Sequence, residues 1–190
     1  HILYKGLLFM GAGAVLQVTG LRKLTDMGGL YKTMPLTLGL YMVGAFAISA
    51  VPLFSGFVSK SMVLSAAAES HLGGIFLVLT LASAGTFLHT GLKLPYYMFF
   101  GKSDDTKRGK EPPPNMLAAM GLAALACIFI GVFPALLYSH LPYSVDYVPY
   151  TVRHVISTVG LLAFTALGFF LLLKRLDPEP TVSLDTDWFY

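Results

Sequence analysis

Residues 50–64, AVPLFSGFVSKSMVL, place a lysine inside an apolar region of the chain. No Asp, Glu, Lys or Arg occurs between Lys32 and Lys60, and apolar residues resume beyond Lys60. A straight helix from Pro35 to Lys60 would rise roughly 37 Å, which exceeds the roughly 30 Å of a hydrocarbon core. Two arrangements are therefore open: either Lys60 emerges at the outer interface of a membrane, or the helix is interrupted and folds back.

The residues just before Lys60 favour an interrupted helix. Pro52 has no N–H to donate, and its ring clashes with the carbonyl group four residues earlier, at Ile48. Gly56 lowers the cost of unwinding the backbone. Broken membrane helices are tolerated only inside protein or beside a water-filled cavity, which is where transporters place their sites. We therefore predict a break near residues 52–56, with the freed backbone groups hydrogen-bonded by three nearby serines, Ser49, Ser55 and Ser59.

The composition of the whole chain is that of an integral membrane protein. Of its 190 residues, 55% are hydrophobic and 12% are charged, against about 25% charged in a typical soluble domain. The mean hydropathy is +0.69. The length of the uncharged runs and their glycines indicate helices that cross the membrane rather than barrel strands. We expect an all-α polytopic protein with about five transmembrane helices, at about residues 1–20, 35–69, 72–100, 115–138 and 153–174.

The distribution of Lys and Arg predicts the orientation of these helices. Basic residues cluster after the first, third and fifth helices: Arg22, Lys23, Lys32, Lys102, Lys107, Arg108, Lys110, Lys174 and Arg175. Five alternating crossings place all three clusters on one side, which the positive-inside rule assigns to the cytoplasm. We expect a multi-pass protein of the cell (inner) membrane, with a transmembrane region at 1–175 and a cytoplasmic C-terminal tail at 176–190. The polar segment 101–115, GKSDDTKRGKEPPPN, is expected to be no more than a connector.

Five basic side chains inside or beside the predicted helices form the candidate site. His1 and Lys5 are four residues apart, and so are His89 and Lys93, so each pair shares one helix face. The fifth is Lys60. Desolvation disfavours the charged form of a lysine, and a histidine titrates near neutral pH, so both residue types can load and unload a proton there. We predict that His1, Lys5 and Lys60 relay protons through a hydrated polar axis at mid-membrane, with His89 and Lys93 as a branch.

Structural explanations stay open for each group. Lys60 would snorkel to the interface if its helix were straight. The second pair could instead hydrogen-bond the carbonyl freed by Pro95, and the first pair could flank the end of a helix. The remaining histidines lie near segment ends and are expected at the membrane interface: His71, His140 and His154.

No other chemistry is indicated. The single cysteine, Cys127, excludes an internal disulfide or a Cys-based metal site, and no Gly-rich phosphate loop, catalytic carboxylate pair or nucleophilic triad occurs. We therefore predict no cofactor and no metal. The net charge of +3 reflects the basic loops, so we infer no nucleic-acid partner from it. Whether the chain works within an enzyme stays open, because a redox-driven translocase would contain a similar transporter subunit.

Three motifs carry a family resemblance: HILYKGLLFMGAGAV at 1–15, LTDMGGLYKTMP at 24–35 and SAVPLFSGFVSKSMVLSA at 49–66. In this order and spacing they resemble the C-terminal portion of the antiporter-like membrane subunits. These occur in Mrp-type multisubunit Na⁺/H⁺ antiporters, as the A-type and D-type subunits, in respiratory complex I and in membrane-bound hydrogenases. The resemblance covers about the first hundred residues. The segments GTFLHTGLKLPYYMFFGK at 85–102 and DTDWFY at 185–190 lean towards the D-type branch.

The resemblance implies roles for three of the candidate residues. His1 and Lys5 match polar residues of the family's broken eleventh helix, and Lys60 matches the lysine of its broken twelfth helix, near the proton path to the outside. It implies proton translocation, with or without coupled Na⁺ exchange, and other membrane subunits as partners. The family's upstream charged residues do not occur here, so this chain alone should not pump. The rival hypothesis is a structural membrane anchor whose lysines only form ion pairs with a partner.

Overall fold

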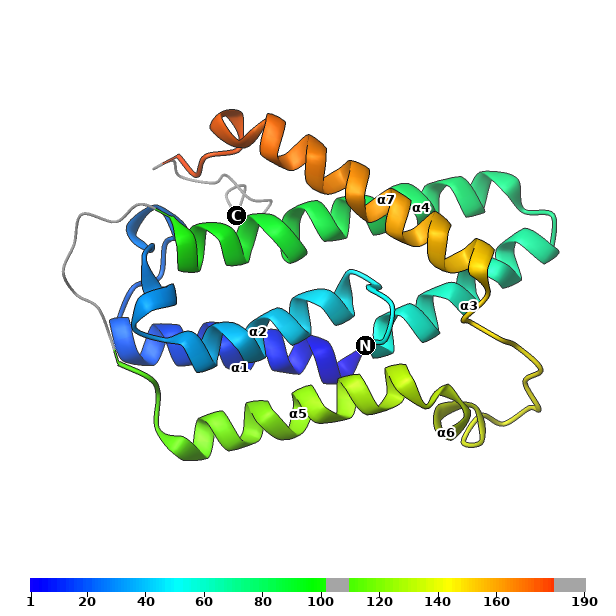
Figure 1. Cartoon of the computed structure of the whole chain (residues 1–190), viewed down its shortest axis with the longest axis horizontal. Helices are drawn as coiled ribbons and strands as arrows, with labels where there is room; N and C mark the ends of the chain where they lie inside the picture. Colours follow the sequence, from blue (N-terminus) through cyan, green and yellow to red (C-terminus); the bar gives the residue numbers. More distant parts are fainter. Residues whose placement is uncertain (102–109, 180–190) are drawn as a thin grey trace, which may run out of the picture.

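The computed structural model describes residues 1–101 and 110–179, and within them the chain is helical with no strand (Figure 1). Its α-helices are α1 (Ile2–Thr19), α2 (Pro35–Ile48), α3 (Ser55–Glu69), α4 (Gly73–Thr86), α5 (Pro114–Val132), α6 (Pro134–Tyr138) and α7 (Val152–Leu171). The helix of α4 continues to residue 100 through two π-helical segments, Phe87–Lys93 and Tyr96–Phe100. The expectation of an all-α fold is confirmed.

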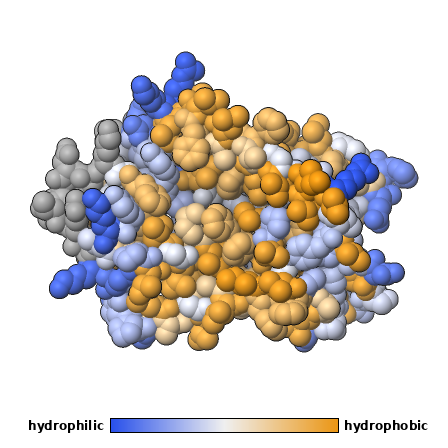
Figure 2. All heavy atoms as spheres, viewed as in Figure 1, coloured by the Kyte–Doolittle hydropathy of each residue, from blue (hydrophilic) through white to orange (hydrophobic). Residues whose placement is uncertain are grey.

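Within residues 1–101 and 110–179, four helices are long and apolar enough to cross a membrane: Ile2–Thr19, Gly73–Phe100, Pro114–Val132 and Val152–Leu171. Helix α2 is apolar but has only 14 residues, about 21 Å of rise, so it cannot cross by itself. Figure 2 shows apolar side chains over the middle of the visible face and hydrophilic ones towards the two ends of the long axis. This distribution is that of a protein surrounded by hydrocarbon. The chain is an integral membrane protein.

The predicted break is confirmed and lies at residues 49–54, between α2 and α3. Two residues there have positive φ, Ala50 at 60° and Leu53 at 74°, a backbone region that side-chain-bearing residues rarely adopt. The expectation that the chain folds back is wrong, because α3 continues away from α2 towards the opposite end of the molecule (Figure 1). The two half-helices together span the length that neither spans alone.

Glycines let the two half-helices and α5 approach one another closely. A Cβ on Gly56, at the start of α3, would collide with the carbonyl of Ala47 near the end of α2. A Cβ on Gly131 of α5 would collide with the carbonyl of Leu53 in the break. Larger side chains at either position would force the backbones apart. The break is therefore packed against its neighbours rather than loosely connected.

Helix α2 is closed at its N-terminus by Glu111, from the connection before α5. The carboxylate of Glu111 accepts hydrogen bonds from Leu36 N (2.6 Å), Thr37 N (3.2 Å) and Thr37 Oγ1 (2.6 Å). An acidic group there satisfies two of the N–H groups that a helix start leaves unpaired and complements the helix dipole. The connector therefore has a structural role that the sequence did not predict. Three of its basic residues, Lys102, Lys107 and Arg108, lie outside the described residues.

The last two predicted helices differ in detail from the structure. The fourth is divided at Phe133, because Pro134 cannot donate the hydrogen bond that would continue α5, and the short helix α6 follows. The fifth, α7, ends at Leu171 and is followed by a single 3₁₀ turn, Leu173–Arg175. Of the predicted tail, residues 180–190, which include DTDWFY, lie outside the described part of the chain.

Candidate functional site

Lys60 reaches back across the break and binds the end of α2. From its place on α3 its Nζ donates a hydrogen bond of 2.6 Å to the carbonyl of Ile48, the last residue of α2. This is the carbonyl that an N–H at position 52 would have bonded in a continuous helix, and Pro52 has none. The half-buried lysine thus replaces the hydrogen bond that the proline removes.

The site acts on the charge of Lys60 in two opposite ways. The C-terminal end of a helix carries unpaired carbonyls and a partial negative charge, which favours an ammonium group there. Partial burial between apolar helices disfavours the same charge. The charge of Lys60 is therefore favoured by the helix end and disfavoured by burial.

The three serines around the break do not take the role predicted for them. Ser49 Oγ donates to the Ala45 carbonyl at 2.6 Å, and Ser59 Oγ donates to the Ser55 carbonyl at 3.3 Å, both one turn earlier. The hydroxyl of Ser55 is buried and has no hydrogen-bond partner within the described residues. It is the side chain of Lys60 that satisfies the freed carbonyl, and no pattern in the sequence predicted this bond.

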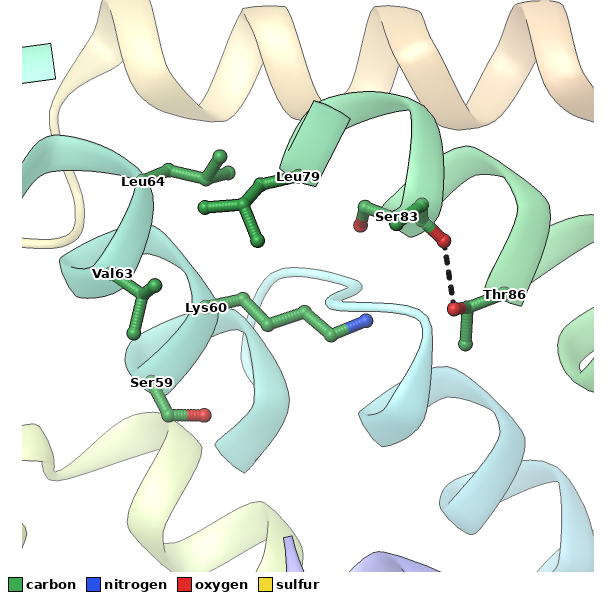
Figure 3. A pocket seen from close by; sticks show the side chains of 8 residues that line it. Ser59, Lys60, Val63, Leu64, Leu79, Ser83 and Thr86 are labelled. Atoms are coloured by element: carbon green, nitrogen blue, oxygen red, sulfur yellow. Dashed lines mark hydrogen bonds between the residues drawn. The ribbon is translucent and has the colours of Figure 1, made fainter. Parts of the chain in front are cut away.

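Lys60 also lines a cavity of about 250 Å³ between α3 and α4 (Figure 3). Its walls are Ser59, Lys60, Val63 and Leu64 from α3, and Leu79, Ala82, Ser83 and Thr86 from α4. The hydroxyl of Thr86 donates to the Ala82 carbonyl at 2.8 Å. The volume is several times the roughly 30 Å³ that one water occupies in the liquid, and the walls offer hydroxyl partners on both sides. The cavity therefore has room for water beside the lysine.

His1 lies near the break between α2 and α3 (Figure 1). Its Nδ1 is 3.0 Å from the hydroxyl of Tyr4, and the two rings meet edge-on with centroids 5.1 Å apart. Tyr4 is buried in a cluster with Ala47 of α2 and Cys127 of α5. Figure 1 places the N-terminus beside the end of α2 and the start of α3. Lys5 is exposed on α1 and makes no side-chain hydrogen bond to another described residue.

His89 and Lys93 lie on the π-helical segment that continues α4. His89 is exposed and Lys93 is half-buried. Among residues 1–101 and 110–179 neither side chain finds a hydrogen-bond partner, so the structural alternative of a bond to the carbonyl freed by Pro95 is not observed. Two polar residues of this helix have different surroundings. Thr86 lines the 250 Å³ cavity beside Lys60. The hydroxyl of Tyr97 donates a hydrogen bond of 3.0 Å to the carbonyl of Leu173, in the turn that follows α7.

His154, expected at the membrane interface, is half-buried and packs against α3. It lies in the first turn of α7, and its ring meets that of Phe57 edge-on, with centroids 5.4 Å apart and planes at 83°. No spacing pattern in the sequence connects residue 154 with α3. The contact could be found only from the fold.

The fold and site define a membrane subunit with a broken helix, and in it a lysine that bonds the broken end beside a cavity. Residues 1–88 match the family model described as "NADH:quinone oxidoreductase/Mrp antiporter, TM". The chain belongs to this family of complex I and Mrp-type antiporter subunits. The expectation drawn from the three motifs is therefore confirmed.

Individual relatives support the same assignment. The chain is 37% identical over 141 residues to a probable K(+)/H(+) antiporter protein, the A/B subunit, of Rhizobium meliloti (strain 1021), a match that covers 71% of this chain. It is 35% identical over 150 residues, 72% of the chain, to the A1 subunit of a Na(+)/H(+) antiporter of Staphylococcus haemolyticus (strain JCSC1435). It is 32% identical over 143 residues, 70% of the chain, to hydrogenase-4 component B of Escherichia coli (strain K12).

These matches cover only a small part of each relative. The chain corresponds to 14%, 19% and 21% of the lengths of the three proteins, in the same order. The relatives are A-type antiporter and hydrogenase subunits, so the resemblance to the D-type branch stays a prediction.

Proposed function

We propose that this chain contributes to proton translocation across the membrane, with Lys60 as a proton carrier at the broken helix. The observation that carries the proposal is the bond from Lys60 Nζ to the Ile48 carbonyl beside a cavity large enough for water. A site that holds an ammonium group beside a cavity with room for water can retain a proton and can release it to water in that cavity. His1, Lys5, His89 and Lys93 are proposed as further members of the relay.

The geometry suggests how Lys60 would work. As an ammonium it bonds the Ile48 carbonyl, a charge-assisted hydrogen bond of about 1.5–3 kcal/mol. When the proton passes to water in the cavity, the neutral amine keeps only a weaker bond and no longer interacts with the dipole of α2. Thr86 and Ser83 offer hydroxyl groups that can orient such water on the α4 side. Binding and release of the proton on Lys60 would thus strengthen and weaken the hydrogen bond that joins α3 to the end of α2.

The setting of this activity is also proposed. Relatives are named as subunits of K⁺/H⁺ and Na⁺/H⁺ antiporters and as a hydrogenase component, so we propose that the chain works with other membrane subunits, with or without cation exchange. The loop charges support a cytoplasmic C-terminus. Large apolar side chains remain exposed along the helices, and lipid or neighbouring subunits would cover them.

A structural anchor is the second candidate, and one observation favours it. The hydrogen-bond partner of Lys60 within the described residues is a backbone carbonyl, so the side chain could serve only to hold the broken helix together. In that case the proton on Lys60 would never need to leave. The two candidates therefore differ in whether a permanently charged side chain can replace the lysine.

The deciding experiment measures proton transport by the intact assembly in inverted vesicles, after each variant has been shown to assemble. We expect Lys60→Ala and Lys60→Arg both to lose transport, because arginine retains the charge but does not release its proton. Lys174→Ala is the matched control, since Lys174 is an exposed lysine after α7, and it should transport normally. Normal transport by Lys60→Arg would show that Lys60 is structural.

A further inference from the structure

The ring of His154 packs against α3, and Tyr150, in the loop before α7, links this contact to α5. It packs edge-on against Phe57 of α3, and the ring of Tyr150 stacks on Phe57 with centroids 5.2 Å apart. The hydroxyl of Tyr150 donates in turn to the carbonyl of Gly131 in α5. The backbone N–H of His154 donates to Thr151 Oγ1, which caps the start of α7. The imidazole is therefore half-buried against Phe57, in the first turn of α7.

A small cavity joins His154 to Lys60. It has a volume of about 30 Å³, and both side chains contribute to its walls, with hydroxyl groups from Thr80 and Ser83 of α4 and from Thr158 of α7. A cavity of this volume holds about one water. A water there would lie among residues that carry an amine, an imidazole and hydroxyl groups. Ser83 and Lys60 also line the larger cavity of Figure 3, so the two spaces meet at the lysine.

A third cavity begins on the other side of His154. It has a volume of about 740 Å³, lies between α3, α4 and α7, and includes Thr151 and Arg153 at the end of the molecule where α7 starts. His154, Thr80 and Thr158 line both this cavity and the small one, so the imidazole stands at their boundary. Lys60, His154 and Arg153 are the basic side chains of these two spaces within the described residues.

We propose that His154 is a relay residue that passes protons between Lys60 and the cavity at the start of α7, an inference that rests on the proposed function. The ammonium of Lys60 gives a proton to water in the small cavity, and this water protonates the free ring nitrogen of His154. The opposite ring nitrogen then releases its proton to water in the large cavity, and the neutral ring returns by exchange of its tautomer. Imidazole is suited to this because its two nitrogens can bind and release protons on opposite sides.

The test compares His154→Gln with His140→Gln in the same vesicle assay. Glutamine keeps the polarity of His154 but cannot carry a proton, so transport should fall about tenfold or more. His140 is exposed and bonds the Leu136 carbonyl of its own turn, so its variant should transport as the parent does. Parental transport by an assembled His154→Gln protein would overturn the proposal.

A second variant separates proton relay from a structural role. His154→Ala leaves space beside the 740 Å³ cavity, and added imidazole should restore transport because a free imidazole can carry the proton across the same boundary. Failure of imidazole to restore transport in assembled His154→Ala protein would show that the ring only supports packing. If Lys60→Ala and Lys60→Arg abolish transport while His154→Gln does not, the function proposed for Lys60 stands and the relay through His154 fails.

Discussion

Pro52 and Pro95 both lie in apolar helical segments, and the chain responds to them differently. At Pro52 the helix breaks, and Ala50 and Leu53 adopt positive φ. Lys60 donates a hydrogen bond to the Ile48 carbonyl, which the proline leaves without a donor. Before Pro95 the helix continues with wider turns, in which Leu94 N–H bonds the carbonyl of His89 five residues earlier. A proline by itself therefore does not decide between a break and a widened helix.

The neighbours of each proline account for the difference. At the Pro52 break two glycines allow close backbone contacts, Gly56 with the end of α2 and Gly131 of α5 with residues 53–54. Lys60 also reaches the Ile48 carbonyl, which would otherwise have no donor. The segment before Pro95 makes no comparable bond from Lys93 within the described residues. A break is stable where the backbones can come together and every freed group finds a partner.

Gly56→Ala should have the largest effect on the Pro52 break. Its Cβ would collide with the Ala47 carbonyl, and overpacking of this kind destabilises by about 3 kcal/mol. The measurement is the thermal unfolding midpoint and yield of the assembled protein. Gly85→Ala is the control, because nothing lies within 4 Å of a Cβ built on Gly85. An unchanged midpoint for Gly56→Ala would mean that the half-helices do not meet as described.

A second prediction compares the two lysines near the prolines. Lys60→Met keeps much of the side chain's length but leaves the Ile48 carbonyl without its donor, which should cost about 1–3 kcal/mol. Lys93→Met should leave stability unchanged, whatever it does to transport. Thermal unfolding of both variants checks this, and equal losses of stability would remove the distinction between the two sites.

A third prediction concerns the other end of α2. Glu111→Ala removes the carboxylate that binds Leu36 N and the amide and hydroxyl of Thr37, and loss of such a cap costs about 1–2 kcal/mol. Glu69→Ala is the matched control, because Glu69 is exposed at the end of α3 and makes no such contact with a described residue. If the two variants unfold at the same temperature, the connector does not support α2.

Pro95→Ala should change stability least. Alanine supplies the missing N–H and allows a regular helix, so stability should change by no more than about 1 kcal/mol. A structure of the variant should show the turns of Phe87–Lys93 narrowing to the α-helical spacing. Persistence of the wide turns would show that packing of Gly91 against Ser49, rather than Pro95, produces them.

The class of the protein and the position of the break could both be predicted from the order of the residues. A membrane helix is recognised from the hydropathy and charge of about twenty consecutive residues, and a proline disrupts the hydrogen bond to the carbonyl four residues before it. Both features depend only on residues that are close in the sequence. The family of the chain also followed from three motifs. The candidate residue Lys60 was found because a lone cation in an apolar run has few explanations.

The contacts of Lys60, Glu111 and His154, in contrast, depend on the packing of the helices. The bond from Lys60 to Ile48 requires the path that the six residues between α2 and α3 follow. Glu111 reaches α2 across 75 and 74 residues of sequence. His154 meets Phe57, and lines the small cavity it shares with Lys60, from another helix. Such contacts depend on how the helices pack against one another, and this packing is a cooperative property of the whole core. It produces no repeating pattern of residues within any one segment.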